Sequence, residues 1–244
     1  GGDGTVNEVI NGLMLAKKES LGEAGFGVIP IGRGNDFAYG ANIPMGLEDA
    51  VSLISSSEAK LIDIGYLEGG DFPEGRYLGN GVGIGFDAVV GFEAVKINFL
   101  PPGFLTYLVA ALKTAFLFFK APKLRIQLDD DVIETKALMV SIMNGRRMGG
   151  GFLMAPTSVI NDGFFDICLV HELSKTRILL TIPKFFEGSQ VNDPNVRMLQ
   201  SKKINVKAIE GSLPVHSDGE TICYEGEELA MEIIPKALKV ISRG

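Results

Sequence analysis

The sequence predicts an α/β segment followed by a larger β-rich domain of the sandwich type. Up to about residue 60, glycine-rich loops alternate with helical patterns, and beyond it short β-type runs are separated by turns. The 244 residues suffice for one large domain or two modest ones. We therefore expect one unit over 1–60 and a second over 61–244, with the final ~15 residues as candidates for a return to the first unit.

The first unit contains three predicted helices and one strand. Apolar residues at helical spacing predict a helix over 6–18. The run 25–31 reads as a short buried strand, and a short helix opens at Phe37. Residues 47–54 again follow a helical pattern, with two acidic residues suited to the first turn.

The second unit is predicted to consist mainly of strands. Residues 60–66 and 76–84 read as the first two strands, and an apolar helix follows over 104–120. The remaining β-type runs are 124–128, 134–143, 164–170, 204–209, 213–216 and 229–234.

The apolar segment 104–120 allows two interpretations. Lys113 interrupts it, and it is shorter than the ~20 residues that cross a bilayer. It is either a helix packed on a sheet or a helix whose apolar face borders a lipid-binding cleft or the bilayer surface.

Composition excludes several classes of protein. Lys and Arg number 23 against 30 Asp and Glu, which gives a net charge of −7 and a pI near 5.0. This balance argues against a sequence-independent nucleic-acid binder. The two cysteines, Cys168 and Cys223, indicate no disulfide framework, and no Cys/His spacing suits zinc. With no signal-peptide pattern at the start, we expect a cytoplasmic location.

The opening segment Gly1–Glu8 has the features of a phosphate site. Glycines let backbone N–H groups converge, and the helix that follows adds the positive end of its dipole. Thr5 is expected to be the N-cap, with Glu8 completing a capping box. The alternative is a plain glycine turn, and the segment is not a Walker A loop.

A second loop, Gly32–Asp36, also lies between a predicted strand and a helix. Arg33 between two glycines can swing toward a phosphate, while Asn35 and Asp36 can cap the helix. A purely structural turn is the alternative. Two such loops at the carboxyl end of one sheet favour a ligand site.

Two later turns carry carboxylates. After the glycine run 149–151, Asp162–Gly163 is either a turn between strands or a source of an oxygen ligand for a hard cation. In Ser217–Glu220, one carboxylate can hold a metal-bound water while the other takes a proton from a hydroxyl. An exposed hairpin turn is the alternative there.

The ordered series GGDGTVNEVINGL, PIGRGNDFA, NGVGIGFDA, GGGFLMAP with DGFFDI, and SDGE resembles the diacylglycerol kinase catalytic-domain family, especially its soluble bacterial members. The resemblance covers essentially the whole chain. The GGDG element alone is shared with NAD kinases and phosphofructokinases, and the later motifs favour the lipid kinases. The resemblance implies an NAD-kinase/phosphofructokinase-like α/β nucleotide domain, a β-rich lipid-kinase domain and an active site between them.

The resemblance also implies roles for individual residues. Glu220 matches the general base, with Asp3 as an alternative that related sphingosine kinases are thought to use. Asp162 matches the carboxylate of a structural Mg²⁺ site, completed by backbone carbonyls at Val159 and Phe164, with Asp218 joined through water. The residues implied for ATP binding are Gly1, Gly2, Asp3, Gly4, Thr5, Val6, Asn7, Gly32, Arg33, Gly34, Asn35 and Asp36.

Two departures from the family pattern affect these expectations. Arg33 stands where the family often has a threonine or serine that contacts the nucleotide. About two strand-helix units that precede the GGDGT motif in the family are absent before Gly1, so we expect part of the nucleotide site to be missing and this chain to be inactive or weak.

The resulting expectation is a lipid kinase that transfers the γ-phosphoryl group of ATP to a lipid hydroxyl, with diacylglycerol giving phosphatidic acid as the leading reaction. The alternatives are phosphatidylglycerol, a sphingoid base or NAD as acceptor, or a catalytically silent lipid- or nucleotide-binding module. The implied cofactors are Mg²⁺ and ATP, and the implied partner is a lipid at the membrane surface, with peripheral membrane association. The oligomeric state stays open, a homodimer being common among soluble members.

Overall fold

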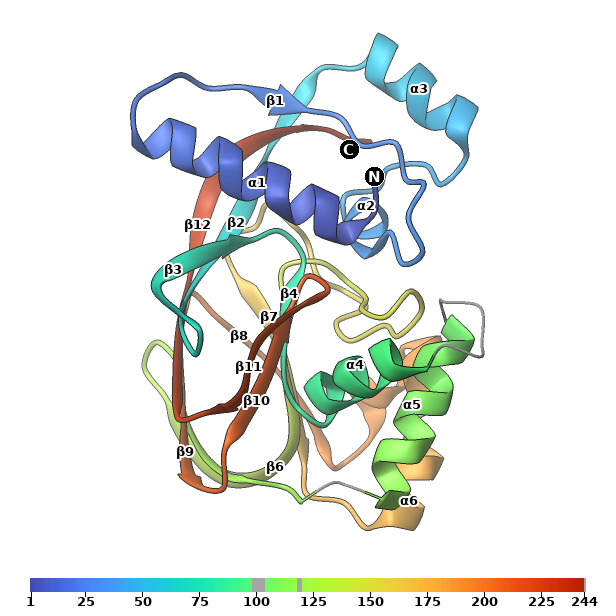
Figure 1. Cartoon of the computed structure of the whole chain (residues 1–244), viewed down its shortest axis with the longest axis vertical. Coiled ribbons are helices and arrows are strands. Elements are labelled where there is room, and N and C mark those ends of the chain that lie inside the picture. The colour runs from blue at the N-terminus through green and yellow to red at the C-terminus, as the bar shows by residue number, and fades with distance from the viewer. Residues whose placement is uncertain (98–103, 118–119, 244) are drawn as a thin grey trace.

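The structure, a computed structural model, describes residues 1–97, 104–117 and 120–243. An upper lobe of helices stands on a larger β-rich lobe, and β2 (Ala59–Gly69) and β12 (Glu228–Ile241) run through both (Figure 1). The end of β12 pairs in parallel with β1 (Gly25–Phe26). The predicted combination of an α/β part and a β-sandwich is confirmed.

The first helix, α1 (Asp3–Lys18), begins three residues before the predicted start at Val6. Gly2 is extended, and its carbonyl accepts the Val6 N–H at 3.0 Å, which closes the first turn. Thr5 therefore lies inside the helix, and the predicted capping box with Glu8 is wrong. Val6, Ile10 and Met14 form the buried face at a spacing of four residues.

The rest of the upper lobe differs from prediction at one strand. Only Gly25 and Phe26 of the predicted strand 25–31 pair, because β12 ends at Ile241 and offers them only its last residues. The helices α2 (Asp36–Gly40) and α3 (Leu47–Ser56) confirm the other two helical predictions.

The β-rich lobe is built from one continuous hydrogen-bonded network of strands. Along its main path the order is β11-β10-β4-β6-β5-β9-β12-β2-β3, with β7 joining β6 to β8. β8 and β11 were not predicted. The strands not yet given are β3 (Phe72–Leu78), β4 (Gly81–Gly85), β5 (Lys123–Gln127), β6 (Val132–Met143), β7 (Phe165–His171), β8 (Val196–Ser201), β9 (Lys203–Glu210), β10 (Leu213–Ser217) and β11 (Glu220–Gly226).

The predicted strand 76–84 is two strands in the structure. β3 pairs with β2, whereas β4 pairs with β6 and β10. The chain breaks between them because the backbone N–H groups of Gly79, Asn80 and Gly81 point to the carboxylate of Asp218. The connection between β3 and β4 is thus held by hydrogen bonds to one buried carboxylate.

Two apolar cores hold the β-rich lobe together. Ile84, Val140 and Ile167 are fully buried between the folded faces of the sheet. A second core lies between β6, β7, β8 and a layer of helices. Full burial of one large apolar side chain in either core stabilises the fold by about 1.5–3 kcal/mol. The helices of this layer are α4 (Phe86–Lys96), α5 (Phe104–Leu117), α6 (Lys175–Thr181) and α7 (Lys184–Glu187), followed by the 3₁₀ turn η1 (Ser189–Asn192).

The helix α5 confirms the predicted helix over 104–117, while residues 118–119 lie outside the described residues. Its small residues Ala110, Ala111 and Ala115 pack inward, and Leu105 and Phe116 are exposed. None of the helices in the described ranges has the length and hydropathy required to span a bilayer. α4 escaped prediction because its apolar residues surround the helix rather than marking one face.

Candidate active site

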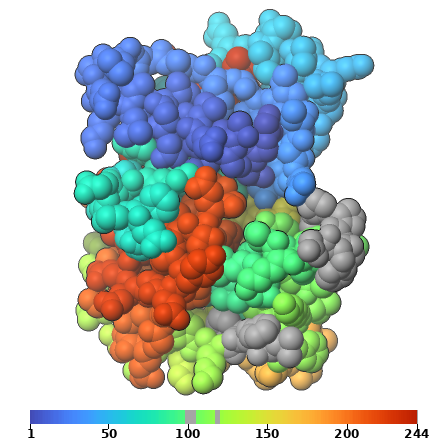
Figure 2. All heavy atoms as spheres, in the orientation of Figure 1, coloured from blue at the N-terminus to red at the C-terminus, as the bar shows by residue number. Residues whose placement is uncertain are grey.

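A cleft of about 600 Å³ separates the two lobes. The N-terminal lobe lies directly above β3 and the tip of the β10–β11 hairpin, and α4 is across the cleft from it (Figure 1, Figure 2). Both glycine-rich loops of the upper lobe reach the cleft, as do Gly149 and Gly150 of the glycine run and the turn after β10. Segments more than 200 residues apart in the sequence thus meet at one place.

The two upper loops touch backbone to backbone. A Cβ atom on Gly32 would lie only 2.3 Å from the Cα of Gly2, so no side chain fits there. Asn35 adopts a left-handed conformation and closes its own loop, since its side chain accepts from the N–H of Gly32 and donates to the carbonyl of Gly32, each at 2.9 Å. Asn35 therefore shapes the loop instead of capping α2.

Asp3 and Asp36 bring two carboxylates together in the cleft. A Cβ on Gly34 would lie 2.7 Å from Oδ2 of Asp3 and 3.2 Å from Oδ2 of Asp36. Asp3 Oδ1 accepts the N–H of Phe37 at 3.0 Å. Burial, followed by the charge of Asp3, raises the pKa of Asp36 to about 7. A cation between these carboxylates would relieve that repulsion.

Arg147 supports Asp36 from the lower lobe. Its Nε donates to Asp36 Oδ1 at 2.9 Å and its Nη2 donates to the carbonyl of Gly34, also at 2.9 Å. The N–H of Gly150 donates to the same carboxylate at 3.0 Å. The glycine run thus approaches the upper lobe closely, as its composition predicts. Arg33, by contrast, is an exposed cation in the wall of the cleft.

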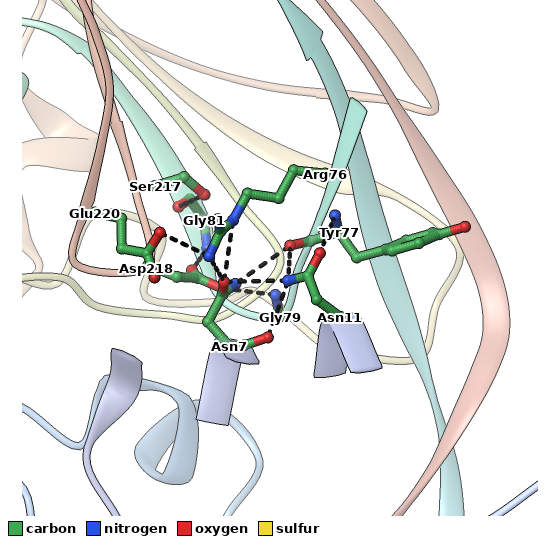
Figure 3. Close-up of polar contacts among 9 residues, drawn as sticks. All are labelled: Asn7, Asn11, Arg76, Tyr77, Gly79, Gly81, Ser217, Asp218 and Glu220. Carbon is green, nitrogen blue, oxygen red and sulfur yellow. Dashed lines mark hydrogen bonds and ion pairs between the residues drawn. The ribbon is translucent and has the colours of Figure 1, made fainter. Parts of the chain in front are cut away.

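Asp218 is buried at the tip of the β10–β11 turn in a left-handed conformation. Its carboxylate accepts the N–H groups of Gly79 and Gly81 at 2.7 and 2.9 Å, and the amide of Asn7 at 2.9 Å. Burial raises the pKa of Asp218, and these hydrogen bonds act in the opposite direction. Asp218 therefore ties α1 to the sandwich (Figure 3).

Glu220 joins this network through Arg76. Its Oε2 lies 2.7 Å from Arg76 Nη2, and the same nitrogen donates to Asn7 Oδ1 at 2.6 Å (Figure 3). Asp218 and Gly219 line the cleft, and Glu220 stands beside them at its rim, one-third exposed. The two carboxylates of this turn therefore have different environments, since Asp218 is buried and Glu220 is partly exposed.

The residues expected to bind ATP fall into two groups. Gly2, Asp3, Gly4, Gly32, Arg33, Gly34 and Asp36 line the cleft. Val6 packs in the core, Asn7 is occupied by Asp218 and Arg76, and Thr5 is exposed on the first turn of α1. The terminal amine of Gly1 donates to the carbonyl of Ile29 at 2.9 Å.

Of the residues predicted to hold a metal, Asp218 lines the cleft, whereas Asp162, Val159 and Phe164 belong to a turn outside it. Asp162 is exposed and its Oδ1 accepts the N–H of Phe164 at 3.0 Å, which makes a local turn. Val159 is about half exposed. Asp63 holds this turn by accepting the N–H of Gly163 at 2.6 Å. The turn is anchored to β2, and none of its residues lines the cleft where Asp218 lies.

Asp3 and Asp36 are a second pair of residues that could hold a cation. Mg²⁺ takes oxygen ligands and is often held by one or two carboxylates together with substrate phosphates. Within the described ranges, no cluster of three or more His, Cys, Asp and Glu side chains could hold a metal without such help. Two converging carboxylates beside the glycine-rich loops fit binding of Mg²⁺ together with a phosphate ligand.

An apolar cavity of about 70 Å³ adjoins the cleft inside the lower lobe. It lies between α4, α5, α6 and the sheet, and three flexible methionines, Met139, Met148 and Met154, are in its wall. Four residues line both spaces and mark their junction: Tyr107, Met148, Gly149 and His216. The polar cleft and the apolar cavity are therefore neighbours at these four residues.

Sequence reasoning missed Arg76, Arg147 and His216 as site residues. The two arginines pair with partners 69 and 111 positions away, which no local pattern reveals. His216 immediately precedes the SDGE motif, so its position beside a predicted site was the available signal. Burial lowers the pKa of His216 to about 4, so its ring is neutral at pH 7.

Comparison with known proteins identifies this arrangement of lobes and cleft. Residues 80–242 match the YegS C-terminal NAD kinase beta sandwich-like domain, and residues 1–67 match the diacylglycerol kinase catalytic domain. Such chains are lipid kinases that use ATP as co-substrate. This chain belongs to the YegS-like lipid kinase family, and the predicted resemblance is confirmed.

Individual relatives agree with this assignment. Proteins of Yersinia pestis and Yersinia pseudotuberculosis named "Probable lipid kinase YegS-like" are 29% identical over 98% of this chain and 76% of their own length. The crystal structure of a diacylglycerol kinase from Bacillus anthracis superposes with a TM-score of 0.71 at 23% identity, over 100% of this chain and 74% of that one. The structural likeness establishes the fold.

Proposed function

We propose that the chain transfers the γ-phosphoryl group of ATP to the hydroxyl of a lipid, with diacylglycerol as acceptor and phosphatidic acid as product. One observation carries the choice of acceptor. The cleft that contains the glycine loops adjoins an apolar cavity, and the two share Tyr107 and His216 in their linings. This junction supports an acceptor whose hydroxyl lies in the cleft and whose acyl chain enters the cavity.

The glycine loops are the proposed phosphate site. The first N–H groups of α1 have no partner within the helix, and the helix dipole favours an anion there. Gly2 and Gly32 let both loops approach the phosphates at once, and Arg33 adds a cation in the wall. Most of the rate enhancement would come from positioning and electrostatics, as in other phosphoryl transfers.

Asp3 and Asp36 are the residues that we propose for Mg²⁺. When bound with the nucleotide, the ion would neutralise charge on the phosphate oxygens. The Asp162 turn remains a second proposal for a structural ion, supported only by its exposed carboxylate.

The transfer requires a carboxylate that accepts the proton of the lipid hydroxyl. As the hydroxyl oxygen bonds to the γ-phosphorus, the bond from that phosphorus to the β–γ bridging oxygen breaks, ADP leaves, and the carboxylate takes the proton. Glu220 is our first candidate for this carboxylate. To act as the base, it must break its ion pair with Arg76 and accept a hydrogen bond from the lipid hydroxyl instead. Asp3 is the second, because it already lines the cleft.

The alternative acceptors differ in whether they have an apolar chain that the cavity could bind. Phosphatidylglycerol and sphingoid bases present the same union of a hydroxyl and long apolar chains. NAD lacks such a chain, and the apolar wall beside Tyr107 favours a lipid over NAD. A silent binding module would bind ATP or lipid without transfer.

The proposal is tested by incubating the full-length protein with labelled ATP and Mg²⁺ against a panel of lipids in mixed micelles. The panel holds diacylglycerol, phosphatidylglycerol, a sphingoid base and undecaprenol. Labelled phosphatidic acid is the expected product. ATP binding in calorimetry without transfer to any lipid would instead identify a silent module.

A further inference from the structure

His216 and Asp87 stand at the junction between the cleft and the apolar cavity. Both line the cavity, and His216 also lines the cleft. His216 lies on β10 opposite Gly83 of β4, and Asp87 is in the first turn of α4. The junction therefore lies where β10, β4 and α4 meet, since β10 pairs with β4 and α4 follows β4 directly.

Gly83 leaves the space that both side chains occupy. A Cβ atom on Gly83 would lie 2.3 Å from Nε2 of His216 and 2.6 Å from Oδ2 of Asp87. Ring and carboxyl thus converge over one glycine. Any larger residue at position 83 would displace them.

Asp87 and His216 differ in their hydrogen-bond partners. Asp87 Oδ2 accepts the hydroxyl of Ser141 at 2.6 Å, and Oδ1 accepts the N–H of Ala88 at 2.9 Å. Within the described ranges, the His216 ring makes no hydrogen bond to another residue. A polar group at an apolar wall is costly without a partner, so this ring suits a ligand or a water.

The position of the ring narrows the ligand chemistry. The acceptor hydroxyl would lie in the cleft, and the chain would lie among Phe86, Val90 and Met139. In a diacylglycerol, the group between hydroxyl and chain is an ester, whose carbonyl oxygen accepts one hydrogen bond. A neutral imidazole has one N–H to donate.

We propose that His216 donates a hydrogen bond to an ester carbonyl of the lipid acceptor and so selects acylglycerols over alcohols that lack this group. Asp87, fixed by Ser141, is the positioning residue that confines the ring. This inference rests on the proposed lipid kinase function and adds the residue that discriminates among lipids.

The test measures binding, which does not require turnover. Calorimetry on the full-length protein compares 1,2-dioctanoylglycerol with its 1,2-dioctyl ether analogue, which has the same hydroxyl and no carbonyl. We expect the ester to bind about tenfold more tightly, the effect of one hydrogen bond. In His216→Phe this preference should disappear, and in His216→Gln, which keeps an N–H donor, part of it should return.

A matched control is Met148→Leu, which changes the apolar wall at the same junction and should weaken both lipids equally. Asp87→Asn keeps an acceptor for Ser141 and should reduce the preference without abolishing ester binding. Equal affinity of the unaltered protein for both lipids would overturn the inference, as would a preference that His216→Phe leaves intact. Selective ester binding without any phosphoryl transfer would refute the proposed reaction and leave this inference standing.

Discussion

Arg76 and Glu220 form an ion pair of 2.7 Å at the rim of the cleft, and Arg76 simultaneously holds the side chain of Asn7 on α1. The guanidinium also lies 5.0 Å from the centre of the Phe72 ring. Through Arg76, the proposed base is therefore connected to α1, the helix that begins at the proposed phosphate site. This connection leads to two predictions about catalysis.

Glu220→Gln should lower phosphoryl transfer by at least 100-fold, the lower end of what a general base contributes. ATP affinity should change little, because Glu220 does not line the cleft near the glycine loops. Steady-state kinetics and calorimetry on the full-length protein measure the two quantities. Glu225→Gln, which alters an exposed carboxylate of the same hairpin, is the control. Full activity of Glu220→Gln would leave Asp3 as the base.

Arg76→Met should lower kcat more than it changes the KM for ATP, since it frees Glu220 and Asn7 together. Lysine cannot make both contacts as a planar guanidinium does, so Arg76→Lys should recover little. If Arg76 acts through Glu220, the double variant with Glu220→Gln should be no slower than Glu220→Gln alone. Additive losses would show that Arg76 has a separate role.

Asp218→Ala should destabilise the fold by about 3 kcal/mol or more. The substitution leaves the buried N–H groups of Gly79 and Gly81 and the Asn7 amide without their acceptor. Urea unfolding measures the change, and Glu225→Ala should stay within about 0.5 kcal/mol of the unaltered protein. A similarly small effect of Asp218→Ala would mean that the link between α1 and the sandwich is dispensable.

Asp87 should make stability fall as the pH rises. Burial raises the pKa of this carboxyl from 3.8 to about 7, so the folded protein holds the proton more tightly than the unfolded chain does. The stabilisation is complete below about pH 4 and is lost through about pH 7. Between pH 5 and 8 the free energy of unfolding should decrease by up to about 3 kcal/mol from this group.

Asp87→Asn cannot titrate and still accepts the Ser141 hydroxyl, so its unfolding free energy should decline less over the same range. Urea unfolding at both pH values, on the unaltered protein and the variant, isolates the contribution. Parallel pH dependence of the two proteins would show that Asp87 is already ionised at pH 5.

Local motifs predicted the glycine loops and the SDGE turn because each is a short segment whose residue types determine its backbone. They also predicted most strands, whose apolar patterns reflect burial on the sheet. The split at Gly79–Asn80 was not predictable, since it depends on a carboxylate that arrives from Asp218, about 140 positions later. Thr5 failed as a cap because Gly2 closed the first turn earlier.

The site was predictable to the extent that it is made of neighbours in sequence. Asp3 and the Gly32–Asp36 loop could be identified, but their support by Arg147 could not, because that pairing exists only after the lobes meet. The turn that contains Asp162 illustrates the same limit. Asp63 anchors it by accepting the N–H of Gly163 from 100 positions away, and no local pattern reveals that contact.

The central claim is that ATP phosphorylates a lipid hydroxyl at the junction of the cleft and the apolar cavity. The most direct measurement offers the full-length protein labelled ATP, Mg²⁺ and equal amounts of diacylglycerol in mixed micelles and NAD, and then follows the label. We predict that the label appears in phosphatidic acid and that Glu220→Gln abolishes this product. Label in the phosphorylated dinucleotide, with none in lipid, would contradict the account.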